Sequence, residues 1–358
     1  MSDGAPSQPG RPSPDGVQFA AQEHARLKTQ VSPVDIFDVI EQSGIWLMFQ
    51  PLVNLYGAYE RVGDAAGIMI NTKHPPSLQR FTAAHEYGHH VLGHMTSLDD
   101  EGHILPDGQM LSPHENAAQT FAAYFLMPPP LVDAVLQHHG LPEEPKRLTP
   151  QEAYLVSLDL GVSYAAALNH LATLGKIDRE VAADLRRYPP KRIKAEITGR
   201  PRPRNDRADT WRLREQDTGR LLRPRLNDEL VADLPELPSS GYIWTVAEGA
   251  VAGPVGHHPP PETAGEAALA LVDDAFVAAV PSGQGMRYGS GGTRRLVFKV
   301  LRFGRHRLLL ARRRPWLPAD PPSAIWMIEL DVASPRTGAT NRGLSERQKP
   351  LVARTAMV

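Results

Sequence analysis

The stretch that most constrains this chain is His85-Glu86-Tyr87-Gly88-His89, with two histidines four residues apart. On an α-helix, residues i and i+4 lie one above the other on the same face. The rings of His85 and His89 can therefore converge on one ion at the zinc–nitrogen distance of roughly 2.0–2.1 Å. Glu86 lies one step round the helix, where its carboxylate can face a water as a general base. The spacing predicts a metal site of the kind found in zinc hydrolases.

The same pattern also occurs on solvated helices whose two histidines lie at the surface without a metal. Phe81, Ala84 and Gly88 fall at helical spacing around the motif, which predicts that one side of this helix is buried. Gly88, without a side chain, would let another element approach closely. These positions favour the metal site over the solvated helix.

A third ligand candidate lies in a second apolar stretch. Residues 114–127 are rich in Ala, Phe and Leu and precede Pro128 to Pro130, which predicts a buried helix that ends there. Glu115 falls in its first turn, and two histidines with one glutamate are a known ligand set of catalytic zinc. Gln119, one turn later, is placed to hold the other ring nitrogen of a ligand histidine. The expected ligands of one Zn²⁺ per chain are His85, His89 and Glu115.

Four further histidines lie near the motif and compete for these roles: His90, His94, His103 and His114. Because His85, His89 and Glu115 already complete a ligand set, we expect each of the four to be solvated or to support a ligand. His94 is the strongest alternative ligand, since it follows His85 by nine residues and lies partly on the same face.

The two motifs together resemble a known family. Arg-Phe-Thr-x-Ala-His-Glu-x-Gly-His at 80–89 and Glu-x-x-Ala-x-x-Phe-Ala-Ala-x-x-Leu-Met-Pro at 115–128 are similar to the ImmA/IrrE family of gluzincin-type metallopeptidases. Asn71 and the run at 34–36 also match its layout. The resemblance implies that Glu86 is the general base of a zinc peptidase, whose ligands are the two histidines of the motif and Glu115. It also implies a narrow protein substrate, a helix-turn-helix transcriptional repressor cut in a stress or mobile-element response. Gln119 departs from the Asp or Asn that is common at its position.

Length and composition limit the number of domains, the kinds of site and the binding partners that this chain can have. A chain of 358 residues is too long for one ordinary core, and its 41% hydrophobic and 22% charged residues are typical of a globular protein. With a net charge of −1, the protein as a whole is not attracted electrostatically to nucleic acid or to membranes. The absence of cysteine excludes disulfides and thiolate sites and fits a reducing compartment. Without a run of 18 apolar residues or a signal peptide at the start, we expect a cytoplasmic protein that does not bind membranes.

Shifts in composition divide the chain into segments. The fold expected overall is α+β in the first half, a minimal gluzincin-like metallopeptidase with a helical extension, followed by an all-β immunoglobulin-like sandwich. The predicted segments are a disordered leader at 1–16, the metallopeptidase domain at 17–145, a helix-turn-helix-like extension at 146–188, a basic Pro-rich linker at 189–207, the sandwich at 208–335 and a flexible tail at 336–358.

Residues 151–177 read as helix, Gly-Val-Ser turn and helix, which resembles a helix-turn-helix. Its second helix offers Asn169 and His170 but no Arg or Lys before Lys176, and phosphate contacts need basic side chains. Direct binding of nucleic acid is therefore disfavoured. We expect the extension to pack against the first domain instead.

The second half carries short apolar runs of β type between turn signals, which predict an antiparallel sandwich. Three segments in this half read Leu237-Pro238-Ser239-Ser240-Gly241-Tyr242, Gly289-Ser290-Gly291-Gly292-Thr293 and Arg313-Arg314-Pro315-Trp316, in that order. They resemble the three loops of chagasin-like inhibitors of papain-type cysteine peptidases, although the first lacks the usual Asn before Pro238. The resemblance implies an immunoglobulin-like fold and a papain-type peptidase or another protein as partner. The loop residues are Pro238, Ser239, Ser240, Gly241 and Tyr242 in the first loop, Gly289, Gly291 and Gly292 in the second, and Arg314, Pro315 and Trp316 in the third.

Two functions remain open from the residues alone. The first is a zinc endopeptidase that uses the motif at 85–89. The second is an inhibitor, binding or sensor protein that acts through the loops of the second half, with the first half as a scaffold. A turn of the sandwich reused to dock a substrate would also explain these loops.

Overall fold

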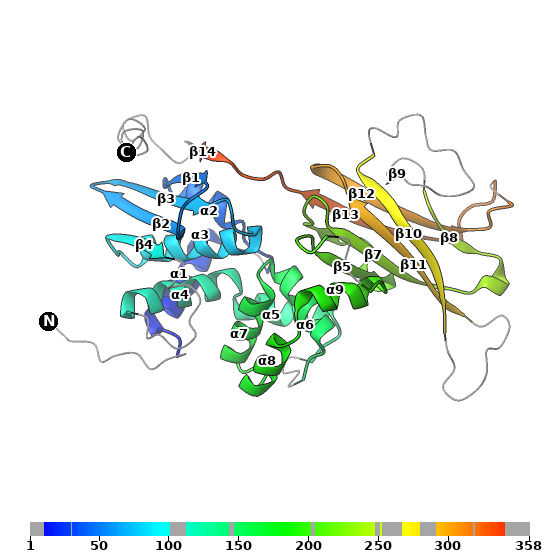
Figure 1. Ribbon diagram of the computed structural model, residues 1–358, viewed down its shortest axis with the longest axis horizontal. Helices are drawn as coiled ribbons and strands as arrows, with labels where there is room; N and C mark the ends of the chain where they lie inside the picture. Colours follow the sequence, from blue (N-terminus) through cyan, green and yellow to red (C-terminus); the bar gives the residue numbers. More distant parts are fainter. Residues whose placement is uncertain are drawn as a thin grey trace. The chain divides into compact units, whose positions relative to one another are not determined.

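The structure is a computed structural model that describes residues 11–29, 31–100, 112–142, 147–201, 205–247, 251–252, 267–279, 291–317 and 319–340 (Figure 1). The chain divides into two compact units. Unit 1 contains the residues up to Tyr188 together with those from Arg336 onward, and unit 2 contains Pro189–Pro335. Helices and strands mix in unit 1 and strands dominate unit 2, so the fold class is α+β as predicted.

Unit 1 is built on a five-stranded sheet with the order β14-β1-β3-β2-β4. Its central strands read as apolar runs, and Leu47, Ile68 and Ile70 are fully buried. The β1 and β3 strands run parallel and the other pairs run antiparallel. The strands are β1 (Trp46–Gln50), β2 (Leu55–Val62), β3 (Ala65–Asn71), β4 (Thr96–Asp100) and β14 (Gly338–Thr340).

Helices cover this sheet in successive layers (Figure 1). The helix α3 packs on β2 and β3, α4 packs on α3, and α1 packs on α4. The approach of α1 to α4 depends on Gly16, because a Cβ there would lie 2.5 Å from the Ala117 carbonyl oxygen. The helices of these layers are α1 (Pro14–Leu27), α2 (Ile36–Gln42), α3 (Pro76–Val91) and α4 (Pro113–Leu126).

The helix-turn-helix-like extension packs within unit 1, as predicted. The Arg80 guanidinium of α3 donates to the carbonyls of Leu160 and Gly161 at the end of α6, at 2.9 and 2.8 Å. His170 of α7 donates to the Met127 carbonyl at the end of α4, at 2.9 Å. The helices of this part are α5 (Pro129–His138), α6 (Pro150–Leu160), α7 (Tyr164–Thr173) and α8 (Arg179–Arg186).

Unit 1 departs from the predicted segments at three places. The predicted leader 1–16 overlaps α1, which begins at Pro14, while residues 1–10 lie outside the described part. The predicted segments gave no strand after α3, where β4 forms by pairing with β2 although its sequence is polar. The predicted tail 336–358 begins with β14, which pairs with β1. Arg336 anchors this strand through ion pairs with Asp35, Asp38 and Glu41.

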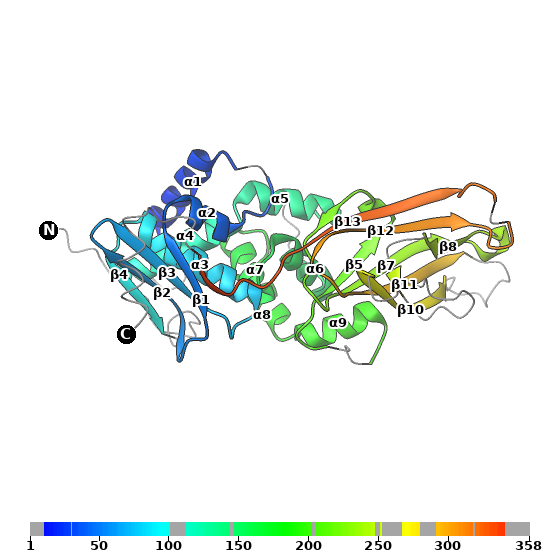
Figure 2. The same ribbon diagram turned by 90° about the horizontal axis from the view of Figure 1, so that it is seen from above.

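Unit 2 consists of two sheets (Figure 2). One has the order β5-β7-β11-β10-β9 and the other β6-β13-β12-β8. The central pairs run antiparallel as predicted, but β5 with β7, β9 with β10 and β6 with β13 run parallel, so the prediction of a purely antiparallel sandwich was wrong at the sheet edges. Phe298 from the first sheet and Leu310 and Ile328 from the second are fully buried in its core. Its strands are β5 (Thr210–Arg214), β6 (Leu221–Leu222), β7 (Glu229–Glu236), β8 (Ile243–Val246), β9 (Val251–Ala252), β10 (Leu269–Ala278), β11 (Gly292–Val300), β12 (Gly304–Arg313) and β13 (Ala324–Val332).

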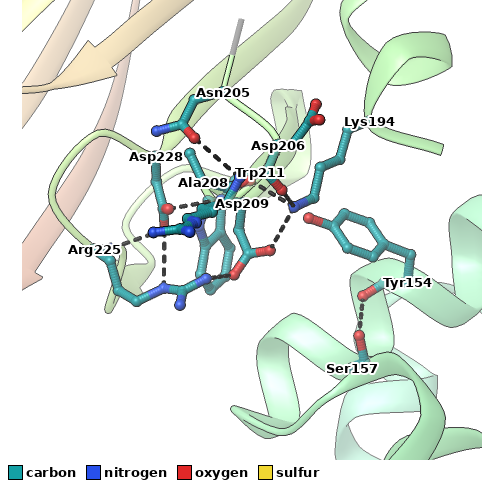
Figure 3. A network of polar contacts seen from close by, with 11 residues as sticks. Tyr154, Ser157, Lys194, Asn205, Asp206, Ala208, Asp209, Trp211, Arg225 and Asp228 are labelled. Carbon is teal, nitrogen blue, oxygen red and sulfur yellow. Dashed lines mark hydrogen bonds and ion pairs between the residues drawn. The ribbon is translucent and has the colours of Figure 1, made fainter. Parts of the chain in front are cut away.

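The predicted linker 189–207 contains a helix, α9 (Pro190–Thr198). Its Lys194 is buried, and the ammonium donates to the Ala208 carbonyl at 2.6 Å and pairs with Asp209 at 3.3 Å (Figure 3). Asp209 also pairs with Arg225, whose backbone N–H donates to the buried Asp228 carboxylate. The segment predicted as a linker therefore contains a buried lysine that fixes α9 to the first strand of unit 2.

Candidate metal centre

The helix α3 is buried along its middle. Every side chain from Phe81 to His89 is buried, because β2 covers one side of the helix and α4 another. Gly88 permits the contact with α4, since a Cβ there would lie 2.9 Å from Phe121 and 3.3 Å from Ala118. The predicted close approach at Gly88 is therefore confirmed, and it brings the N-terminal turn of α4 beside the motif.

The structure brings His85, His89 and Glu115 together. The Nε2 atoms of the two histidines lie 3.1 Å apart, and Glu115 Oε2 lies 3.2 Å from His85 Nε2 and 3.6 Å from His89 Nε2. Ligands of a tetrahedral zinc ion at roughly 2.0–2.2 Å are separated by about 3.4 Å, so the three donor atoms fit one ion. The histidine side chains are 2% exposed and that of Glu115 is 24% exposed, which leaves access from one side.

The electrostatics of the cluster favour a charged carboxylate. Burial raises the pKa of Glu115, but hydrogen bonds with the His85 and His89 rings outweigh that effect and hold the pKa well below its usual range. The backbone of Glu115 is fixed as well, because its N–H donates to the Ser112 side chain that caps α4. The acid is thus presented to the two imidazoles as an anion, the state in which it can bind a cation.

Glu86 is fully buried on the side of α3 that faces β2. A Cβ on Gly57 of β2 would lie 3.1 Å from Glu86 Oε1 and 2.5 Å from Thr82 Cγ2. Glu86 is not among the three residues whose donor atoms converge, and its role as general base stays a prediction.

The remaining histidines have separate positions. His90 points away from the cluster, and its Nδ1 lies 3.1 Å from the Tyr59 hydroxyl. His94 lies behind His89, with the two Nδ1 atoms 2.9 Å apart, and its ring contacts that of His114 at a centroid distance of 4.3 Å. Burial, and after it the His89 and His114 rings, lower the pKa of His94 to about 4. His103 lies outside the described residues.

The supporting role predicted for Gln119 remains a prediction. Gln119 is half-buried on α4, and within the described part of the chain it is His94 whose ring nitrogen meets the second nitrogen of His89.

A polar cluster between α1 and α3 was missed from the sequence. The Tyr87 hydroxyl donates to Glu23 at 2.5 Å, Glu23 pairs with Arg26, and Ser43 lies 3.0 Å from the same hydroxyl. Burial, and after it Glu23, raise the pKa of Tyr87 to about 12, so the phenol keeps its proton. The spacing of Glu23 and Arg26 on one helix face was the available signal.

The loops predicted for unit 2 lie close together at one end of its strands. Trp316 packs on Gly241, where a Cβ would lie 2.8 Å from the indole, and the Arg314 guanidinium lies 4.5 Å from the centre of the Tyr242 ring. Gly291 of the second loop lies beside Leu237 at the start of the first. Gly289 lies outside the described residues. Trp316 is 64% exposed and Leu237 48% exposed, so the loops present apolar surface to solvent.

None of the helices in the described part of the chain has the length and apolar character needed to cross a bilayer.

The first of two family matches falls on unit 1. Residues 40–171 match the IrrE N-terminal-like domain. This range includes the motif at 85–89 and Glu115. The chain is 35% identical over 98 residues to the "Radiation response metalloprotease IrrE" of Deinococcus radiodurans, which covers 27% of this chain and 29% of that protein. The chain thus spans less than a third of the length of this curated relative.

The second family match, to the chagasin family of peptidase inhibitors, spans residues 224–329. Among solved structures, the cysteine protease inhibitor EhICP2 from Entamoeba histolytica is 22% identical, with 36% of this chain and 100% of that chain covered and a TM-score of 0.28. PbICP-C, solved in complex with falcipain-2, is 17% identical, with 35% and 91% covered and a TM-score of 0.19. The two family matches, at 40–171 and 224–329, confirm the resemblance of the first part of the chain to IrrE-like proteins and of the second part to chagasin-like inhibitors.

Proposed function

We propose that the protein is a zinc-dependent, site-specific endopeptidase of the HExxH gluzincin type. The observation that supports this most is the convergence of His85 Nε2, His89 Nε2 and Glu115 Oε2 from two helices, one of which also carries the buried Glu86. The name of the relative in Deinococcus radiodurans, a metalloprotease, supports the same class of reaction.

The chain supplies both binding and proton transfer in this proposal. The two imidazoles and the Glu115 carboxylate hold the ion, and Glu86 takes a proton from the attacking water and passes it to the leaving amine nitrogen. Zinc, when bound, supplies Lewis acidity that polarises the scissile carbonyl and acidifies water. The carbon–nitrogen bond breaks as the amine gains this proton, so one water is consumed for each peptide bond cut.

The proposed substrate is a helix-turn-helix transcriptional repressor, cut as part of a stress or mobile-element response. The ImmA/IrrE resemblance supports this substrate, as does the radiation response in the name of the relative. The strand β4 is the edge of the unit 1 sheet on the side of β2, and an extended peptide can add to an open strand edge.

The experiment compares the wild-type chain with Glu86→Gln, using helix-turn-helix repressors of the source genome as substrates and mass spectrometry to detect cleavage. We expect Glu86→Gln to retain about one zinc per chain and lose cleavage by at least about 100-fold, the scale of general-base catalysis. His89→Ala should lose the zinc itself. Full activity of Glu86→Gln would remove Glu86 from the mechanism, and unchanged zinc in His89→Ala would remove the metal centre.

A second function is favoured by the clustered loops of unit 2. We propose that unit 2 is an immunoglobulin-like sandwich whose loops bind a papain-type cysteine peptidase or a related protein. Trp316, packed on Gly241 and 64% exposed, would be the aromatic anchor of such a contact.

Titration of papain with the full-length Glu86→Gln chain tests this second function without interference from peptidase activity. Inhibition that falls at least about 10-fold with Trp316→Ala but not with Leu301→Ala, a comparably apolar residue 40% exposed at the far end of β11, would support it. No inhibition at micromolar concentrations would exclude papain-type peptidases as partners.

A further inference from the structure

The C-terminal end of α3 forms a turn that places a further side chain next to the candidate metal centre. Leu92 caps the helix, and Gly93 follows with a φ of 75°, a left-handed conformation that glycine adopts without cost. The His94 N–H bonds the His89 carbonyl at 2.9 Å and the Gly93 N–H bonds the His90 carbonyl at 3.2 Å. These two bonds define a Schellman motif, in which the residue after the glycine folds back over the last turn of the helix.

This fold-back determines where the His94 ring lies. In a Schellman motif the side chain after the glycine contacts the residue whose carbonyl it bonds, which is His89 here. The contact is polar in this protein, because the Nδ1 atoms of the two rings lie 2.9 Å apart. The His114 ring also contacts His94, at a centroid distance of 4.3 Å. The ring of His94 is therefore held between the last turn of one ligand helix and the first turn of the other.

The chemistry of the ligand assigns a direction to this hydrogen bond. A histidine that binds a metal through Nε2 carries its remaining proton on Nδ1, and that N–H needs an acceptor. His89 Nε2 faces His85 and Glu115, so its Nδ1–H points at His94. A neutral His94 accepts this proton at Nδ1 and carries its own proton on Nε2. With its Nδ1 occupied by this hydrogen bond, His94 would not bind the ion through that atom, in line with the expectation that it supports a ligand.

We infer that His94 is a positioning residue of the metal centre, which accepts the Nδ1 proton of His89 and fixes that ring with Nε2 toward His85 and Glu115. The inference rests on the proposed metal centre, and it assigns to the helix C-cap the supporting role that the sequence predicted for Gln119. Outer partners of ligand histidines typically change metal affinity by about 10- to 100-fold.

Two substitutions separate the hydrogen bond from the packing of the ring. His94→Asn keeps an acceptor oxygen close to the place of Nδ1 but loses the ring, whereas His94→Phe keeps a ring but has no acceptor. We expect His94→Phe to weaken zinc binding about 10- to 100-fold and His94→Asn to stay within about threefold of wild type. A role in packing alone would reverse this order.

The measurement is competition for zinc between the full-length chain and a chelator, with a long-range ¹H–¹⁵N spectrum of the zinc-loaded protein to report the His89 tautomer. The expected spectrum shows a proton on His89 Nδ1 that exchanges faster in His94→Phe. Wild-type zinc affinity in His94→Phe would overturn the inference and leave the proposed function intact. A wild-type chain that binds no zinc would overturn the metal centre and the role of His94 with it.

Discussion

Gly57 is the position where one added methyl group should most directly disturb the candidate site. It lies in β2 opposite Ile70 of β3, with α3 packed over it. A Cβ at this position would lie 2.5 Å from Thr82 Cγ2 and 2.8 Å from the Met69 carbonyl oxygen. Carbon atoms in contact normally lie about 3.5–4.0 Å apart, so β2 and α3 would have to separate by about 1 Å.

The expected cost of Gly57→Ala follows from these distances. Overpacking a well-packed core costs about 1–3 kcal/mol, and replacing glycine in a strand recovers about 0.5–1 kcal/mol of backbone entropy. We therefore expect the free energy of unfolding to fall by about 1–2 kcal/mol, a substantial part of the roughly 5–15 kcal/mol typical of a domain. Because the same Cβ would lie 3.1 Å from Glu86 Oε1, the carboxylate should move with the helix. A misplacement of about 1 Å at a reacting group can cost about 100-fold in rate.

Denaturant unfolding of the full chain, followed by fluorescence, measures the loss of stability, and cleavage of the proposed repressor substrate measures the loss of rate. The matched control is Gly67→Ala in β3 of the same sheet, where the nearest atom to a Cβ is Trp46 Cε3 at 3.2 Å, part of a side chain that can shift. Equal stability and activity of Gly57→Ala and Gly67→Ala would refute the close contact between β2 and α3.

Two further predictions concern the helical extension of unit 1. Arg80→Ala removes a guanidinium that donates to three backbone carbonyls at 2.8 to 2.9 Å, and we expect a loss of about 3 kcal/mol in denaturant unfolding. Arg187→Ala, at a side chain 82% exposed, should change stability by less than about 0.5 kcal/mol, and equal losses would contradict this account. Burial lowers the pKa of His170 in the folded protein to about 4. In the unfolded chain its pKa is near 6.5, so as the pH falls His170 binds a proton in the unfolded chain before it does so in the folded one. The free energy of unfolding should therefore decline by up to about 3 kcal/mol between pH 6.5 and 4. Below pH 4, His170 should cause no further decline. His170→Gln, which keeps a donor for the Met127 carbonyl, should remove this part of the pH dependence, and an unchanged slope would assign it to other groups.

The parts of the site that the sequence predicted are those that local spacing determines. The i and i+4 positions of His85 and His89 require one helical face, and the apolar pattern after Glu115 required a second buried helix. Gly88 indicated where the two helices meet. The strands of the second half followed from apolar runs between turn signals in the same way.

The parts that were missed depend on partners far away in the chain. The strand β14 consists of Gly338-Ala339-Thr340, which has no strand pattern of its own and forms only because β1 offers hydrogen bonds. The strand β4 is polar and forms by pairing with β2. The helix α9 was different, because Ile193 and Ile197 at helical spacing were visible beside the basic residues that suggested a linker.

The position of β14 has a consequence for variants of the gene that carry a premature stop codon. Because unit 2 is inserted before the last strand of unit 1, any premature stop within residues 189–335 also deletes the segment that pairs with Leu47, Met48 and Phe49. The shortened product would keep both histidines and Glu115, yet Trp-Leu-Met-Phe would become an uncharged, proline-free border strand open to a second molecule. A nonsense mutation in the chagasin-like part should thus yield a self-associating protein rather than a shorter form of the proposed peptidase.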